Sequence, residues 1–434
     1  MRIAMILRRL NVKGGTQRQA LSLGRELLRR GHKVDLYTLD LDRERCYPDL
    51  LALFPRIHEI SPEAHAQAER LPTLARFLPS PLIALIRENR LARALAREIP
   101  ADYDLLNPHD QVAYKIAYYY KTKNTTRSNI QHRVLNKNVE HSVLNSMPSI
   151  WNMNDLPLKM WAYDHRRGQE ETFRQPWHRL LAYRLFDTYD VKKFIRRQDA
   201  IVVVDFFNRD LVRHYMGLKA FTVRSGPDFE HFPFREHEPP KNRSVRVLTS
   251  GIFLPHRRYE DAIIGTSILR SRGYDATLTI LGLRENDPSY NAKLVALTRE
   301  SGIEQYVTFT GSVSEERLIA LYHTHHIYTF QHHLQSDGLS PFEAAACGMP
   351  IVVSKTAGCH ELLTDGENAL LIEPKNPEDW AQKIAALTDD PALYRRLATA
   401  ANSFVRANFS WEKYADGFLQ VVTEVQTSGA QVRL

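Results

Sequence analysis

Residues 245–372 alternate short apolar runs with helical stretches, and this alternation constrains the fold more than any other feature of the chain. Continuous apolar runs that alternate with helices predict strands buried on both faces, as in a parallel sheet covered by helices. The strands are expected at 245–252, 276–281, 307–310, 327–331, 351–354 and 369–372. The helices between them are expected at 258–272, 291–301, 315–323 and 340–347.

The first half begins with the same type of unit. Arg2–Leu7 predicts a buried strand, Asn11–Gly15 a loop, and Lys33–Leu39 a second strand. Thr16 and Gln19 have the spacing of a capping box for a helix that runs to about Arg30. Doubly wound folds bind phosphates at such a strand-to-helix turn, but the third glycine of the dinucleotide fingerprint is missing. A hydride-transfer cofactor is therefore disfavoured.

The length of the chain indicates two domains, because 434 residues exceed one comfortable hydrophobic core. Pro239 and Pro240 lie in the natural linker. We expect an α/β protein of two Rossmann-like doubly wound domains that face a central cleft, since ligands bind at the carboxyl ends of parallel strands. The expected boundaries are 1–232 for an N-terminal acceptor-binding domain, 243–410 for a C-terminal nucleotide-sugar-binding domain, and 411–434 for a helix that can pack back on the first domain.

Basic residues are concentrated in the first half. Residues 1–220 contain 37 Lys and Arg against 24 Asp and Glu, whereas the remainder contains 21 against 26. This asymmetry fits an anionic partner, and equally well a solvated basic face. Residues 71–99 also have the pattern of a basic amphipathic helix, which can lie on an anionic membrane but more often packs on its own domain.

The three cysteines, Cys46, Cys347 and Cys359, have no metal-binding spacing and do not form an even set. They favour a reducing compartment. The apolar part of the N-terminus is too short for a secretory signal, and no apolar run approaches the ~18 residues that span a bilayer. The expected location is cytoplasmic, with peripheral contact at a membrane face.

Residues 335–350 carry the strongest functional signal. A glycine turn at Gly338 leads into a short helix that begins near Ser340 and contains Glu343. Gly338 lets the backbone approach a ligand, and the free N–H groups of the helix attract phosphate. A carboxylate one turn into the helix can accept hydrogen bonds from sugar hydroxyls. Alone, this pattern is more often a capped helix after a buried strand.

Further motifs, which follow one another in order along the chain, strengthen the ligand-binding interpretation of residues 335–350. The first half contains Gly14-Gly15-Thr16-Gln17-Arg18 and Arg30-Gly31-His32-Lys33-Val34. The second contains 251–261, 309–313, 335–353, Gly358-Cys359-His360-Glu361 and Gly366-Glu367-Asn368. In this order the chain resembles a family 4 glycosyltransferase of GT-B fold over nearly its whole length. The resemblance implies sugar transfer from a nucleotide diphosphate donor with retention at the anomeric carbon, and no bound metal or other cofactor.

The resemblance also implies roles for individual residues. Arg257 and Arg258 lie where the family places its diphosphate-binding lysine, and Glu343 matches the glutamate that holds the ribose. The remaining donor-binding candidates are backbone or loop positions: Gly15, Gly311, Val313, Asp337, Gly338, Leu339 and Ser340. The donor is expected to be a UDP- or GDP-sugar.

The sequence departs from the family pattern at two places. Gln335 stands where the family has its first motif glutamate, which contacts the donor sugar. Asp337 is a candidate for the missing carboxylate. Ile252 replaces the arginine that follows the glycine of the first strand of this half. Both changes predict altered donor contacts within an unchanged fold.

On the acceptor side, His109 is the candidate for the family's catalytic histidine, and the alternative is a structural histidine. Asn154 and Asp155, at the end of the next strand, are candidate acceptor ligands. Metal-like spacing also occurs among several histidines of the second half, but the expected strands and turns separate them, so no metal site is predicted. They are His323, His325, His326, His332 and His333.

Three functions therefore remain at this stage. The first is glycosyl transfer to a glycan or lipid-linked acceptor at a membrane face. The second is epimerisation or hydrolysis of a sugar nucleotide by the same fold, which Gln335 keeps open. The third is non-catalytic binding of a polyanion, although no recognised nucleic-acid-binding module is present and nucleic acid is not an expected partner.

Overall fold

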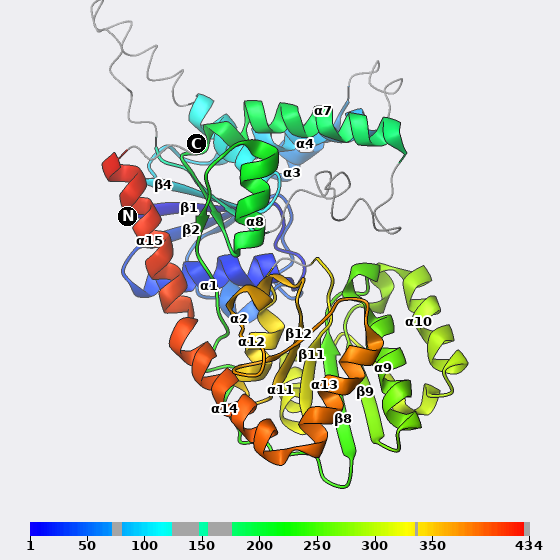
Figure 1. Cartoon of the computed structure of the whole chain (residues 1–434). Coiled ribbons are helices and arrows are strands. Elements are labelled where there is room, and N and C mark those ends of the chain that lie inside the picture. Colours follow the sequence, from blue (N-terminus) through cyan, green and yellow to red (C-terminus); the bar gives the residue numbers. More distant parts are fainter. Residues whose placement is uncertain (72–79, 124–146, 155–175, 335–336, 429–434) are drawn as a thin grey trace, which may run out of the picture.

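The computed structural model describes residues 1–71, 80–123, 147–154, 176–334 and 337–428. These residues form two parallel β-sheets, each covered by helices (Figure 1). This is the GT-B architecture of two Rossmann-like domains, and it confirms the predicted fold class.

The N-terminal sheet has seven strands in the order β3-β2-β1-β4-β5-β6-β7. All of its strand pairs are parallel, beginning with Ile3 opposite Val34 and Leu105. Its strands are β1 (Arg2–Leu7), β2 (Lys33–Thr38), β3 (Ile57–Glu59), β4 (Leu105–His109), β5 (Ile150–Met153), β6 (Ala200–Val203) and β7 (Phe221–Thr222).

The C-terminal sheet has six strands in the order β10-β9-β8-β11-β12-β13. These strands agree closely with the apolar runs of the sequence, and the central strands β11 and β12 are buried along their whole length. They are β8 (Ser244–Ser250), β9 (Asp275–Leu281), β10 (Val307–Gly311), β11 (Ile327–Phe330), β12 (Ile351–Ser354) and β13 (Leu370–Ile372).

Helices join the strands in both domains. In the first domain they are α1 (Gly15–Arg29), α2 (Pro48–Leu51), α3 (Pro62–Glu69), α4 (Ser80–Glu98), a helix through residues 113–123, α7 (Trp177–Lys193) and α8 (Phe206–Leu211). In the second they are α9 (Tyr259–Ser271), α10 (Pro288–Glu300), α11 (Glu315–Thr324), α12 (Leu339–Ala346), α13 (Pro377–Asp389), α14 (Pro391–Asn408) and α15 (Trp411–Ser428).

The last helix, α15, returns to the N-terminal sheet (Figure 1). Trp411, Tyr414 and Phe418 belong to the same buried cluster as the β1 residues Ile3 and Met5. Burying large aromatic side chains there joins the end of the chain to the first domain. The two domains are therefore connected twice, once by the segment after β7 and once by α15.

The predicted capping box at the start of α1 is wrong. The helix begins at Gly15, and its N-cap is Gly14, which has no side chain to bond the free N–H groups. Gln19 instead donates to the Ser225 hydroxyl at 3.1 Å. The first turn of α1 therefore presents open N–H groups rather than capped ones.

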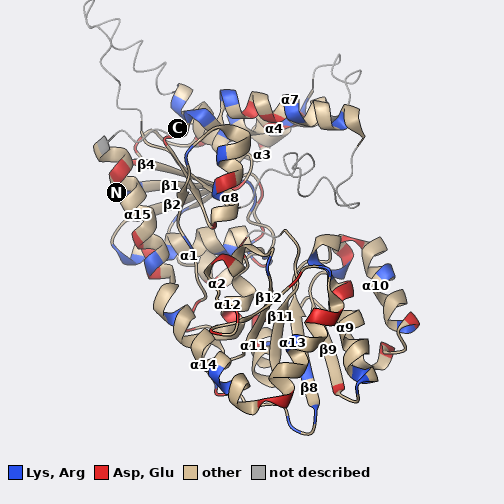
Figure 2. Ribbon diagram, in the orientation of Figure 1, with Lys and Arg blue, Asp and Glu red and all other residues tan. Residues whose placement is uncertain are grey.

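The basic segment before residue 99 packs on its own domain. Ala92, Leu95 and Ala96 on α4 are buried against the N-terminal sheet. Its arginines and those of α7 lie on the outer part of that domain (Figure 2). Among the described residues, no helix combines the length and apolar character needed to cross a bilayer.

Candidate active site

A cavity of about 530 Å³ lies between the two domains. Its N-terminal wall comes from the start of α1, from Tyr47 and from Asn154 after β5. Its C-terminal wall comes from the carboxyl ends of β8, β9 and β11 and from the start of α12. The cavity is therefore at the place where open α/β sheets bind ligands.

Two glycines let the ends of β8 and β9 lie close together in the C-terminal wall and leave their backbone accessible to a ligand. A Cβ on Gly282 would lie 1.8 Å from the carbonyl oxygen of Gly251, so the ends of β8 and β9 can approach only without side chains. Both residues line the cavity. A large ligand can therefore rest directly on this backbone.

The start of α12 also faces the cavity. Gly338, its N-cap, has φ +135° and provides no side-chain hydrogen bond to the free N–H groups of the helix. Leu339 and Ser340, in the first turn, line the cavity. The uncapped N–H groups and the helix dipole favour an anion at this end of the cavity.

Glu343 is the carboxylate beside that helix end. It is 8% exposed and accepts a hydrogen bond from the Tyr322 hydroxyl at 3.2 Å. Burial raises the pKa of Glu343, while nearby Arg18 and the Tyr322 hydrogen bond oppose the increase. The carboxylate can therefore accept hydrogen bonds from ligand hydroxyls when it is ionised.

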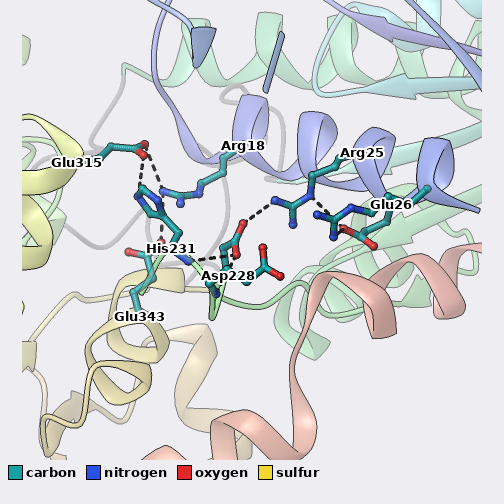
Figure 3. Close-up of polar contacts among 9 residues, drawn as sticks. Arg18, Arg25, Glu26, Asp228, His231, Glu315 and Glu343 are labelled. Atoms are coloured by element: carbon teal, nitrogen blue, oxygen red, sulfur yellow. Dashed lines mark hydrogen bonds and ion pairs between the residues drawn. The ribbon is translucent and has the colours of Figure 1, made fainter. Parts of the chain in front are cut away.

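Arg18 connects Glu343 to the N-terminal domain (Figure 3). Its Nη1 lies 3.8 Å from an oxygen of Glu343 and 3.8 Å from an oxygen of Glu315 on α11. Another oxygen of Glu315 lies 2.7 Å from His231 Nε2. The sequence analysis quoted Arg18 within the first family motif but gave it no role, because its partners are more than 290 residues away.

The structure separates the two arginines that the family resemblance paired. Arg257 lines the cavity, and its Nη1 donates to His332 Nδ1 at 2.9 Å. Arg258 does not line it and forms an ion pair with Asp261 at 2.6 Å. Arg258 has φ +53° and is the N-cap of α9, so its side chain turns toward the first turn of that helix.

His332 lines the cavity, although the sequence analysis named it only within a group of histidines and gave it no role. It is fully buried, and burial together with nearby Arg257 lowers its pKa well below the ordinary value. The imidazole is therefore neutral, and Nδ1 accepts from Arg257 while Nε2 carries the proton. This hydrogen bond fixes one end of the Arg257 guanidinium in the cavity.

His109 lies outside the cavity. It is fully buried in β4, and its Nε2 is hydrogen-bonded to Asn107 at 2.7 Å. Burial lowers the pKa of His109 to about 3. This environment matches the structural alternative for His109 better than the acceptor role that the resemblance implied.

The other candidates are divided. Gly15, Val313, Asp337 and Asn154 line the cavity, whereas Gly311 ends β10 outside its lining. Gln335 and Asp155 lie outside the described residues. Over the described ranges, His, Cys, Asp and Glu side chains form no group of three that could hold a metal ion.

Asp337 belongs to a second contact between the domains. Its backbone N–H donates to Asp205 Oδ2, at the start of α8, at 2.6 Å. Burial, and then the Asp205 charge, raise the pKa of Asp337 to about 7, and burial raises that of Asp205 to about 6. Glu361 crosses the same boundary and accepts from Arg224 at 2.7 Å.

This contact should make stability depend on pH. Asp337 has an ordinary pKa of about 3.8 and a folded value near 7, so its ionisation costs the folded protein stability as the pH rises from about 4 to 7. Asp337→Asn removes that cost. It should raise the free energy of unfolding by about 4 kcal/mol at pH 8 and change it little at pH 4.

Urea unfolding at the two pH values measures this difference. Asp210→Asn is the control, because Asp210 is an exposed carboxylate of the neighbouring α8. An Asp337→Asn effect of equal size at pH 4 and pH 8 would contradict the assigned pKa.

Comparison with known proteins finds a family similarity in the second half of the chain. Residues 231–404 match the family model for glycosyl transferases group 1. The matched segment supplies the C-terminal wall of the cavity, including Arg257, Glu343 and the start of α12.

Curated relatives match the chain over part of their length. A glycogen synthase of Mycobacterium tuberculosis is 27% identical over 230 residues, which cover 52% of this chain and 54% of the relative. A D-inositol 3-phosphate glycosyltransferase of Rhodococcus jostii is 32% identical over 181 residues, which cover 41% of this chain and 40% of the relative. The chain thus spans about half or less of the length of these relatives.

Solved structures match both domains. Sucrose-phosphate synthase from Thermosynechococcus elongatus aligns with a TM-score of 0.70 at 18% identity over 99% of this chain and 100% of the other. HepE from Anabaena, solved in complex with UDP and glucose, aligns with a TM-score of 0.66 at 14% identity over 97% and 99%. At these identities the likeness supports the GT-B fold.

Proposed function

We propose that the chain transfers a sugar from a nucleotide diphosphate donor to a glycan or lipid-linked acceptor, with retention at the anomeric carbon. The observation that carries the proposal is the juxtaposition of Arg257, the uncapped start of α12 and buried Glu343 in one interdomain cavity. A phosphate-binding end beside a hydroxyl-binding carboxylate matches a nucleotide sugar. The complex of HepE with UDP and glucose supports the same donor class.

In this proposal Glu343 accepts hydrogen bonds from the ribose hydroxyls, and the diphosphate lies against Arg257 and the first N–H groups of α12. Asp337 stands close to the expected donor sugar as the candidate for the carboxylate that Gln335 lacks. The bond between the anomeric carbon and a diphosphate oxygen breaks, and its electron pair leaves with the diphosphate. The acceptor oxygen bonds the same face of that carbon, and its proton passes to the leaving diphosphate.

Fixed donors perform the electrostatic part of this reaction. Negative charge grows on the diphosphate as the bond breaks, and a preorganised guanidinium and backbone N–H groups stabilise it without reorganising. The proposal therefore requires no bound metal. His332 is a positioning residue, because it holds Arg257 through a hydrogen bond and does not need to touch the donor.

A thermal-shift screen tests the proposal. UDP-, GDP- and ADP-sugars are added to the whole chain, and a bound donor at about 100 times its Kd stabilises the protein by roughly 2.7 kcal/mol. Stabilisation by one donor series, followed by acceptor-dependent release of the nucleotide diphosphate, is the expected result. Release without an acceptor would favour the hydrolase alternative, and no stabilisation by any donor would reject the donor site.

The proposed acceptor lies at an anionic membrane face, which the basic outer surface of the first domain supports. Arg93, Arg97 and Lys193 line a separate cavity of about 480 Å³ between α4, α7 and residues 118–123. Arg93 lies over the Tyr119 ring at 4.8 Å, and Lys193 donates to the Tyr189 hydroxyl at 2.5 Å, which holds both side chains at this cavity. Of the other α4 arginines, Arg87 lies 3.5 Å from Glu69, and Arg90 donates to the Ala68 carbonyl at 2.9 Å.

Changing Arg93, Arg97 and Lys193 together to Gln should therefore weaken binding to phosphatidylglycerol vesicles by more than about tenfold, at about 1 kcal/mol per charge near the surface. Vesicle co-sedimentation at two salt concentrations measures this. Arg395→Gln, an exposed arginine of α14, is the control. Equal sedimentation of the triple variant and the parent chain would place membrane contact elsewhere.

A further inference from the structure

A larger cavity, of about 810 Å³, lies within the N-terminal domain. It is bounded by the segments that follow β1 and β2, by the end of β3, by α3 and by Leu91 of α4. These are the carboxyl ends of three adjacent parallel strands, where α/β sheets place their ligands. Its polar lining residues are Arg8, Arg9, Asn11, Asp40, Glu59 and His65.

Arg8 and Arg9 are the cations of this cavity. They follow the last residue of β1, and their backbone is fixed because the Arg8 carbonyl accepts from Leu39 N–H at 3.1 Å. The Arg9 carbonyl accepts from the Gln17 side chain at 3.3 Å. Both side chains are exposed. Burial raises the pKa of Asp110, and the Gln111 N–H and then the charges of Arg8 and Arg9 oppose that increase.

Neighbouring groups hold both carboxylates of the cavity by hydrogen bonds. Asn11 donates to Asp40, and Leu41 N–H donates to Glu59 at 2.9 Å. Among the described residues, neither carboxylate forms an ion pair with Arg8 or Arg9. The lining thus combines two guanidinium groups with oriented carboxylate and amide groups, which can accept hydrogen bonds from sugar hydroxyls.

We infer that this cavity binds an anionic sugar, one that carries a phosphate or carboxylate group, and that this sugar is the acceptor or its terminal residue. Arg8 and Arg9 bind the anion, while Asp40, Glu59 and His65 bind hydroxyls. That the sugar serves as the acceptor rests on the proposed function, whereas its binding in this cavity does not.

The position of the two cavities supports this role. Asn11 lines the larger cavity, and Gly15, four residues later, lines the interdomain cavity. Four residues span at most ~14 Å, so one short loop separates the two walls. A sugar that enters the N-terminal cavity can therefore extend a hydroxyl around this loop toward the donor.

The test compares glucose 6-phosphate, glucuronate, glucose and inorganic phosphate by calorimetric titration of the whole chain. We expect glucose 6-phosphate or glucuronate to bind at least tenfold more tightly than glucose, and inorganic phosphate to compete. Arg8→Gln with Arg9→Gln should abolish that preference. The matched control, Arg43→Gln with Arg45→Gln, removes two exposed charges from the same domain and should keep it.

UDP titration of the same variants separates this inference from the proposed function. Unchanged UDP affinity in Arg8→Gln with Arg9→Gln shows an intact donor site, whereas absence of UDP binding in every form rejects the donor site alone. Arg8→Lys with Arg9→Lys keeps the charges and should keep part of the preference. Equal affinity for glucose and its phosphate, an unaltered preference in the Gln pair, or displacement of the sugar phosphate by UDP would overturn the inference.

Discussion

Glu343→Ala should lower the affinity for the nucleotide donor by about a hundredfold or more. Glu343 is the buried carboxylate of the interdomain cavity, and hydrogen bonds to a charged group contribute about 1.5–3 kcal/mol each. Two ribose hydroxyls would lose such partners at once. Calorimetric titration with UDP or with the donor found by the screen measures the change.

Glu315→Gln is the matched control for this variant. Glu315 lies at the same 3.8 Å from Arg18 but does not line the cavity. If both variants lose the donor equally, the effect comes from the contact between the domains and not from the ribose. Unchanged donor affinity in Glu343→Ala would remove Glu343 from the site.

Arg257→Ala should reduce turnover on the order of a hundredfold or more, because removing one preorganised donor to a developing charge has effects of this size. The loss should be larger in kcat than in donor affinity, since the charge on the diphosphate grows in the transition state. Steady-state kinetics with saturating donor separates the two. Arg257→Lys should recover part of the loss, because a lysine keeps the positive charge but cannot form the bidentate hydrogen bonds of a guanidinium.

Arg258→Ala is its control. The two arginines are adjacent in sequence, yet Arg258 is held by Asp261 outside the cavity. Only a small effect on turnover is expected, together with some loss of stability at the start of α9. An equal loss in both variants would contradict the division that the structure makes between them.

The fold could be predicted from the sequence because its signals are local. Buried parallel strands have continuous apolar runs, and helices between them keep their own period, so β8 to β13 were predicted to within a few residues. Gly338 and Glu343 could be singled out for the same reason. Their turn and their helix are adjacent in the chain, and both line one cavity.

The parts that the sequence did not predict depend on contacts between distant segments. Arg18 reaches Glu343 across the domain boundary, and Asp337 meets Asp205 in the same way. His332 is one of several histidines that lie close together in the sequence. Its burial beside Arg257 distinguishes it from the others. No local pattern contains that information.

A structure of the chain bound to its nucleotide diphosphate would test the central idea most directly. The predicted result is a ribose whose hydroxyls lie within about 3 Å of the Glu343 carboxylate, with the diphosphate against Arg257 and the first turn of α12. A nucleotide bound outside this cavity, or one bound inside it with Glu343 still facing only Arg18 and Tyr322, would contradict the account.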